Sequence, residues 1–251
     1  MGTIVKVKGD KNNILYYIVS YDGDKVLLFG LNYRIAITVT KDQIIEAEIS
    51  DIKRESDYNL QYQNNIIKGM TRYAKKFVLG TVLHLDGDQT YLEKCKELYD
   101  SIGIYNYSIC VKEELMKVKI KDILKQITPD IVVITGHDSF NNNDIKDLKN
   151  YKNSQHFMDT VLEIRKSNQI CCVVAGACQS HFEGLIASGA NFASSPKRIN
   201  IHTYDPAVIA IRIATTSITK LVSFDGAVRF IENGKEAFNG VESFGKMRML
   251  L

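Results

Sequence analysis

The sequence has no large excess of one charge, no long apolar run and few cysteines. Lys and Arg total 32 against 29 Asp and Glu, a net charge of +3, whereas nucleic-acid binders usually carry a larger or clustered basic excess. The longest apolar run covers only 170–178, far short of the ~20 residues of a membrane span. Apolar residues at 45% and charged residues at 24% exclude a disordered or fibrous chain. We expect a globular protein without nucleic-acid or membrane partners.

The cysteine count is odd. Five cysteines stand at positions 95, 110, 171, 172 and 178, so at least one thiol cannot pair within the chain. Free thiols are typical of a reducing compartment or of a working thiol. Residues 1–10 alternate apolar and polar and lack the apolar core of a secretory signal. These features predict a cytoplasmic protein rather than a disulfide-stapled one.

Three segments differ in their pattern. Residues 1–48 hold short apolar runs with a turn signal at 21–24, which predicts a small SH3-like β-barrel. Residues 49–76 are polar and charged, as expected of a helix or linker. From 77 to 251 the pattern predicts an α/β catalytic domain that ends in a hairpin at 221–230 around Asp225-Gly226.

Buried strands alternate with amphipathic helices in the third segment. This alternation predicts an α/β fold with a parallel, doubly wound sheet and helices on both faces. We expect strands at 77–85, 105–111, 131–134, 170–175 and 191–193, and helices at about 90–101, 113–126, 154–166, 180–188 and 206–216.

Two chemically active side chains follow strands of this sheet. His137 comes just after the 131–134 strand and Cys178 just after the 170–175 strand, and functional sites in such sheets lie at the carboxyl ends of the strands. A nearby histidine can deprotonate a cysteine or stabilise its thiolate. The other four cysteines fall within a helix or strand. The pair therefore predicts a cysteine nucleophile with a histidine partner.

Other residues at the same edge suggest supporting roles. The backbone at Gly136 and the Cys178 amide could stabilise an oxyanion, and Asp138 could orient His137. Asp86 and Asp88 follow the first strand, and a carboxylate there would favour a cationic substrate side chain. Asp205 is a second candidate for that task. No metal or other cofactor is expected.

Five blocks carry a resemblance to a known family. They are VLHLDGD (82–88), PDIVVITGHD (129–138), YKNS (151–154), AGACQSHFE (175–183) and GANFASSPKRINIH (189–202), and they resemble the sporulation-specific protease YabG family. The resemblance implies a cysteine peptidase with His137 and Cys178 as the catalytic pair. It also implies cleavage after basic residues in spore coat and cortex-related proteins, in the sporulating cell and in association with the spore coat.

A more distant resemblance is to the caspase, legumain and clostripain group. Those enzymes carry His-Gly after one strand and Ala-Cys after another. This chain has Ala177-Cys178, but Gly136 precedes His137. Gly176 also replaces the acidic or amide residue that often precedes Ala-Cys, which leaves the substrate pocket and the oxyanion donor open.

Several alternatives remain open at this point. A glutamine-amidotransferase-like thiol hydrolase would use Cys178 with His202 and Asp205. A non-catalytic receiver-like module would keep Asp86 and Asp88, but Thr135 stands where a phosphoacceptor aspartate is needed. A metal site from Cys178-x-x-His181 lacks a partner motif. A peptidase could also clip itself within 49–76, where Arg54, Arg72, Lys75 and Lys76 lie.

Overall fold

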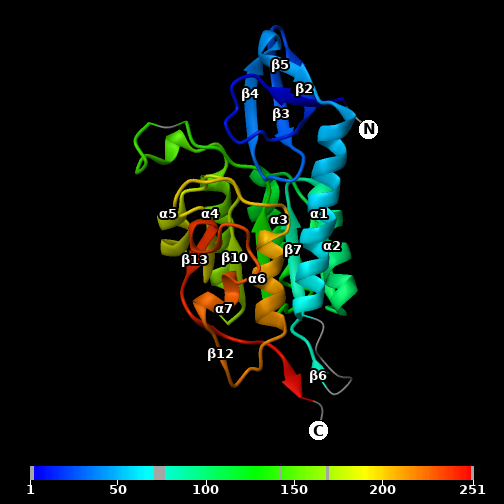
Figure 1. Cartoon of the computed structure of the whole chain (residues 1–251). Coiled ribbons are helices and arrows are strands. Elements are labelled where there is room, and N and C mark those ends of the chain that lie inside the picture. Colours follow the sequence, from blue (N-terminus) through cyan, green and yellow to red (C-terminus); the bar gives the residue numbers. More distant parts are fainter. Residues whose placement is uncertain (1–2, 71–76, 142, 168–169, 250–251) are drawn as a thin grey trace.

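The structure is a computed structural model that describes residues 3–70, 77–141, 143–167 and 170–249. Arg72, Lys75 and Lys76 of the expected self-cleavage segment lie outside the described residues. None of the helices in these ranges is both long and apolar enough to cross a membrane. Figure 1 shows a small N-terminal sheet above a larger α/β part, with the long helix α1 (Ile49–Met70) running down along both.

The N-terminal strands form one antiparallel sheet in the order β4-β3-β2-β1-β5. Asp22 pairs with Lys25 across a tight turn in which Gly23 has a φ of 58°, a conformation that glycine adopts without steric cost. Val26 and Leu28 alternate inward. The closed SH3-like barrel stays a prediction. The strands are β1 (Ile4–Val7), β2 (Tyr16–Asp22), β3 (Lys25–Gly30), β4 (Ala36–Thr40) and β5 (Ile44–Glu46), with a 3₁₀ turn at Lys41–Gln43.

The α/β part is built on a six-stranded sheet in the order β13-β11-β10-β9-β7-β8. All neighbours are parallel except β13, which runs antiparallel to β11. When the parallel strands are numbered along the chain, their order across the sheet is second, first, third, fourth, fifth. They are β7 (Val82–Asp86), β8 (Asn106–Cys110), β9 (Ile131–Thr135), β10 (Cys172–Ala175) and β11 (Phe192–Ser194), followed by β13 (Phe238–Gly240).

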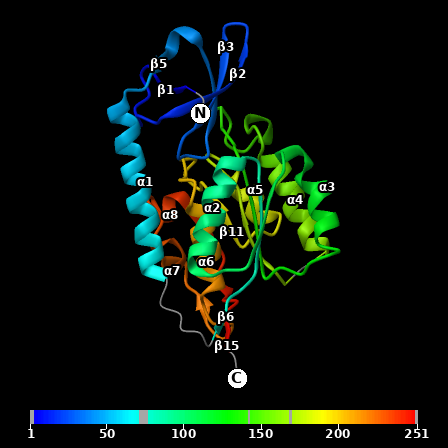
Figure 2. The same ribbon diagram turned by 90° about the vertical axis from the view of Figure 1, so that its right-hand side faces the viewer.

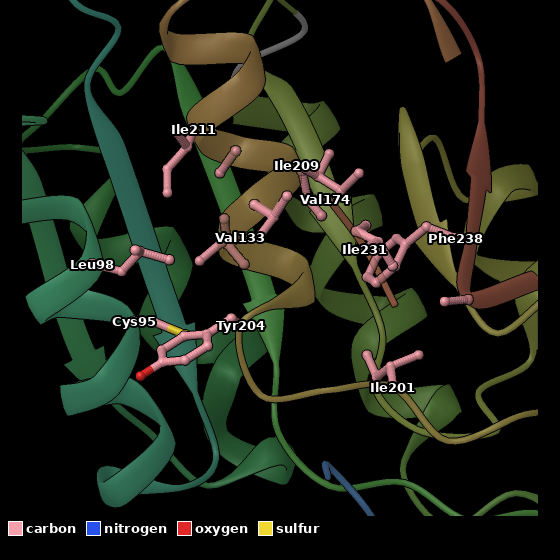
Figure 3. Packing of buried hydrophobic residues seen from close by; sticks show 14 of the residues in the cluster. Cys95, Leu98, Val133, Val174, Ile201, Tyr204, Ile209, Ile211, Ile231 and Phe238 are labelled. Carbon is pink, nitrogen blue, oxygen red and sulfur yellow. The ribbon is translucent and has the colours of Figure 1, made fainter. Parts of the chain in front are cut away.

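Helices cover both faces of this sheet (Figure 2). In β9, Val133 joins one apolar cluster and Val132 joins the other, because successive side chains of a strand point to opposite faces. Figure 3 shows α6 lying across the first of these faces, with Ile209 near Val174. The helices are α2 (Gln89–Ile102), α3 (Met116–Ile123), α4 (Ser154–Ser167), α5 (Phe182–Ala187) and α6 (Asp205–Ala214), with 3₁₀ turns at Glu113–Leu115 and Leu148–Asn150.

Two expected elements were wrong. The strand expected at 77–85 is split into β6 (Phe77–Val78) and β7, because the Gly80 amide leaves the sheet to donate to the Ala214 carbonyl at 3.0 Å. The expected hairpin at 221–230 contains a helix instead. Ser223 caps that helix by accepting from the Gly226 amide at 3.2 Å. The remaining elements are β12 (Leu221–Val222), α7 (Phe224–Val228), α8 (Gly234–Ala237), β14 (Ser243–Phe244) and β15 (Arg248–Met249).

Candidate active site

His137 lies buried at the end of β9, with 2% of its surface exposed. Its Nε2 is 2.9 Å from Asp88 Oδ2. A carboxylate can only accept, so Nε2 carries the hydrogen and Nδ1 carries a lone pair. Within the described part of the chain, that Nδ1 has no hydrogen-bond partner. One ring nitrogen is therefore anchored by Asp88, and the other has no hydrogen-bond partner among the described residues.

Asp88 holds this ring because the local fold fixes the carboxylate. It is the N-cap of α2, where its Oδ1 accepts from the Tyr91 amide at 3.0 Å, a usual task for aspartate. Its Oδ2 also accepts from the Tyr17 hydroxyl of the N-terminal sheet. Burial alone would raise the pKa of Asp88, but the hydrogen bonds from His137, Tyr17 and the Tyr91 amide outweigh it and hold the pKa well below its usual range.

The N-terminal sheet covers the His137 ring. Phe29 of β3 lies against it, with ring centroids 3.7 Å apart and planes 32° apart. Tyr91 of α2 borders it at 5.1 Å. In this arrangement the N-terminal region closes over the carboxyl end of the sheet, which sequence analysis did not anticipate.

Cys178 follows β10 and is fully buried. Its Sγ accepts from the Ile201 amide at 3.2 Å and lies 3.5 Å from the Ile201 carbonyl oxygen. Burial raises the pKa of the thiol well above its usual range, although the Ile201 amide opposes this. The thiol is therefore protonated in this state, and it requires a base to become a nucleophile. Among the described hydrogen bonds, none joins Cys178 to His137.

Arg34, on the loop between β3 and β4, enters the same edge with its side chain fully buried. Its Nη1 donates to Asp86 Oδ2 at 2.7 Å. Its Nε and Nη2 both donate to the Thr203 carbonyl at 3.1 and 3.0 Å. The guanidinium also lies 5.2 Å from the Tyr91 ring centroid and 3.5 Å from Cys95 Sγ. These groups therefore enclose the Arg34 guanidinium.

The backbone around Arg34 pairs with the segment after Cys178. The Arg34 amide donates to the Ile201 carbonyl at 3.1 Å, and the Thr203 amide donates to the Asn32 carbonyl at 2.9 Å. These bonds frame an antiparallel bridge between Tyr33 and His202. The Cys178 amide donates to the Arg34 carbonyl at 3.3 Å. The Cys178 amide, which we expected to stabilise an oxyanion, therefore donates its hydrogen bond to a peptide carbonyl of the same chain.

The three acidic residues that are candidates for binding a basic substrate side chain lie in three different environments. Asp86 holds Arg34, and Asp88 holds His137. Asp205 accepts from the Tyr62 hydroxyl at 2.7 Å and from the His202 amide at 2.9 Å. Burial raises the pKa of Asp205 to about 7. Asp88 and Asp205 therefore have other tasks in this structure, whereas Asp86 faces a guanidinium.

Asp138, expected to orient His137, does not do so. Its carboxylate accepts from the Asn153 and Ser139 amides at 2.8 and 2.9 Å and from the Ser180 hydroxyl at 2.8 Å. Asp138 therefore connects the loop after β9 to the start of α4. The carboxylate that is hydrogen-bonded to the His137 imidazole belongs to Asp88. Two residues before Asp138, Gly136 leaves room for Glu113, whose Oε1 would clash with a Cβ at this position. That carboxylate accepts from the His137 amide at 2.8 Å.

The residues of the alternative readings also have other partners. The His202 ring packs against Tyr62 at 4.6 Å, and Asp205 accepts from the His202 backbone rather than from its ring. The two do not form an imidazole–carboxylate pair. In the metal alternative, His181 Nδ1 instead accepts from the Gly184 amide at 2.9 Å and caps α5. Thr135, at the phosphoacceptor position, donates to the Gly176 carbonyl at 2.9 Å.

An open cavity of about 440 Å³ lies beside the Cys178 loop. Its acidic residues, Glu232 and Glu236, were not among the expected site residues, because neither directly follows a parallel strand of the large sheet. The Tyr33 hydroxyl donates to Glu232 at 3.3 Å, which joins the cavity to the segment that carries Arg34. The cavity is lined by Asn12, Ile14, Tyr33, Gln179, Arg198, Ile199, Asn200, Glu232, Asn233 and Glu236.

Comparison with known proteins gives the family to which this chain belongs. The model of the family described as YabG peptidase U57 matches residues 1–251, and the chain belongs to this family. It is 43% identical over 176 residues to the sporulation-specific protease YabG of Bacillus subtilis (strain 168). That alignment covers 68% of this chain and 60% of the Bacillus protein, so the chain spans about three fifths of that relative's length.

Proposed function

We propose that the chain is a cysteine endopeptidase that cleaves after Arg or Lys in spore coat and cortex-related proteins during sporulation. Family membership supports a peptidase, and the Bacillus relative carries the name of a sporulation-specific protease. The observation that carries the cysteine mechanism is the Cys178 amide on a peptide carbonyl, 3.3 Å from the Arg34 oxygen. A nucleophile whose own amide binds a substrate carbonyl is typical of acyl-transfer sites.

In the proposed mechanism His137 acts as general base. Its Nδ1 takes the Cys178 proton, directly or through a water, and Sγ attacks the scissile carbonyl carbon. The Cys178 amide stabilises the oxyanion. Collapse breaks the carbon–nitrogen bond, and His137 returns its proton to the leaving amine. Water then hydrolyses the thioester and regenerates the thiol. The high pKa of the buried thiol favours this route over a preformed thiolate.

Self-cleavage and a substrate pocket at Asp86 belong to the same proposal. Arg34 at Asp86 supports the acidic pocket, because a guanidinium and a carboxylate 2.7 Å apart make a strong charge-assisted hydrogen bond. The glutamine-amidotransferase-like alternative is less well supported, because the His202 ring has no carboxylate partner among the described residues.

The test is cleavage of Arg-, Lys- and Asp-terminated peptide reporters by the purified chain. Cys178→Ala is expected to lower kcat/KM by about 10⁴-fold or more, whereas Cys110→Ala, at an exposed thiol, is the matched control and leaves activity unchanged. His137→Ala should abolish activity and His202→Ala should not. Loss only with His202→Ala would sink the assignment of His137, and a preference for Asp reporters would contradict the acidic pocket.

A further inference from the structure

Arg34 sits at the proposed active site as a substrate residue would. Its amide and carbonyl are both hydrogen-bonded on the nucleophile side of the edge: to the Ile201 carbonyl at 3.1 Å and to the Cys178 amide at 3.3 Å. Two residues earlier, the Asn32 carbonyl accepts from the Thr203 amide at 2.9 Å. Antiparallel pairing of an extended peptide with a site strand is a common way to bind peptides.

The side chain of Arg34 occupies a built pocket. Asp86 supplies a carboxylate, the Thr203 carbonyl accepts two guanidinium hydrogens, and the Tyr91 ring lies 5.2 Å from the guanidinium carbon. Arg34 and Asp86 are both fully buried. Burying such a pair is costly and brings little net stability. This cost is easier to understand if the pocket also serves to recognise cations.

The residue after Arg34 lies beside the proposed base. Ile35 forms an isolated parallel bridge with Asp138, the residue next to His137. The Phe29 ring, five residues before Arg34, lies against the His137 ring in a tilted arrangement. The Arg34–Ile35 peptide bond therefore lies between the segment of the nucleophile and the segment of the base.

From these contacts we infer that the Arg34–Ile35 bond is a self-cleavage site of this chain, and that Asp86, the Thr203 carbonyl and Tyr91 form the pocket for the basic residue before any bond that is cut. The inference rests on the proposed cysteine peptidase function. It places the cut in the β3–β4 loop rather than in the 49–76 segment.

The reaction balances within the chain and one water. The Cys178 Sγ bonds to the Arg34 carbonyl carbon, its proton moves to His137, and the Arg34–Ile35 carbon–nitrogen bond breaks. The proton passes to the Ile35 nitrogen, which becomes a new amino terminus. Water then adds its hydroxyl to the Arg34 carbonyl carbon, the carbon–sulfur bond breaks, and the remaining hydrogen of the water returns to the Cys178 sulfur. The fragments 1–34 and 35–251 stay associated through the β3–β4 pairing.

The experiment incubates the purified full chain and follows it by intact mass and amino-terminal sequencing. We expect a new terminus at Ile35 in the wild-type chain and in the matched control Arg54→Gln, whose arginine is exposed on α1. We expect none in Cys178→Ala or Arg34→Gln. Cleavage within 49–76 instead, or a terminus at Ile35 that persists in Cys178→Ala, would overturn the inference.

A second measurement avoids dependence on how Arg34→Gln folds. A Leu-Asn-Tyr-Arg reporter copies residues 31–34, and Asp86→Asn is expected to lower its kcat/KM by about 100-fold, with Asp100→Asn as the exposed control. If reporters are cut in a Cys178-dependent way while the Arg34–Ile35 bond stays intact, Arg34 only forms a structural ion pair with Asp86. In that case the self-cleavage inference fails and the proposed function stands. If nothing is cut, the proposed function fails as well.

Discussion

The N-terminal sheet and the six-stranded sheet bring different chemistry to the surface where they meet. The α/β part contributes charged and reactive groups at the ends of parallel strands, among them Asp86, His137 and Cys178. The N-terminal sheet contributes groups that fill and cover this edge, namely Phe29 on the His137 ring and Arg34 on Asp86. One region holds the proposed catalytic groups, and the other covers them.

In this arrangement the N-terminal sheet blocks the proposed active site. The Cys178 thiol is fully buried and the His137 ring is 2% exposed, so a peptide from another protein cannot reach them while Arg34 stays in place. The proposed cleavage of other proteins would therefore require the β3–β4 loop to leave the edge.

The largest expected effect breaks the contact between the two regions. In the Cys178→Ala background, Asp86→Ala should lower the free energy of unfolding by about 3–5 kcal/mol, because Arg34 is left buried without its carboxylate. Replacing both residues, Arg34→Met with Asp86→Leu, should recover most of that loss. Urea unfolding followed by circular dichroism measures both. If the double variant is no more stable than Asp86→Ala, the Arg34–Asp86 ion pair is not the main interaction between the two regions.

A smaller effect separates the two carboxylates at the end of β7. Asp88→Asn should lower kcat for peptide reporters by about 100-fold with little change in KM, because Asp88 holds His137 and does not touch the peptide. Asp100→Asn, in an exposed pair with Lys96, is the control. Steady-state kinetics measures the split. A rise in KM at constant kcat would assign Asp88 to substrate binding instead.

Sequence patterns predicted much of the α/β part because its signals are local. Apolar runs such as 131–134 and 170–175 mark strands that are buried on both faces, and His137 and Cys178 follow them directly. The hairpin prediction at 221–230 was wrong for an equally local reason. Asp225-Gly226 suits a tight turn, but Ser223 caps a helix there and the glycine lies in its first turn.

The rest depended on contacts between distant parts of the chain. Nothing near Arg34 in the sequence indicates that it reaches Asp86, 52 residues away, or the Thr203 carbonyl, 169 residues away. Neighbours in the chain were also misleading. Asp138 follows His137 directly, yet its carboxylate faces the start of α4, and the carboxylate on the imidazole comes from Asp88, 49 residues earlier.

The smallest effect concerns two buried groups, His202 and Asp205, whose pKa values are shifted in opposite directions. Burial, with the charges of Lys94 and Arg34, lowers the pKa of His202 to about 3, and burial raises the pKa of Asp205 to about 7. Below pH 6.5 the unfolded histidine gains a proton that the folded one does not, so His202 makes the fold less stable as the pH falls. The folded Asp205 gains a proton before the unfolded one does, so Asp205 makes it more stable over the same range.

Between pH 7 and pH 5 each contribution is about 2 kcal/mol, and the two nearly cancel. Relative to the wild-type chain, His202→Gln should therefore gain about 2 kcal/mol of unfolding free energy on going from pH 7 to pH 5. Asp205→Asn should lose a similar amount. Urea unfolding at the two pH values, in the Cys178→Ala background, measures these differences. If the unfolding free energies of both variants change with pH as that of the parent does, then neither His202 nor Asp205 is buried as their contacts with Tyr33 and Tyr62 require.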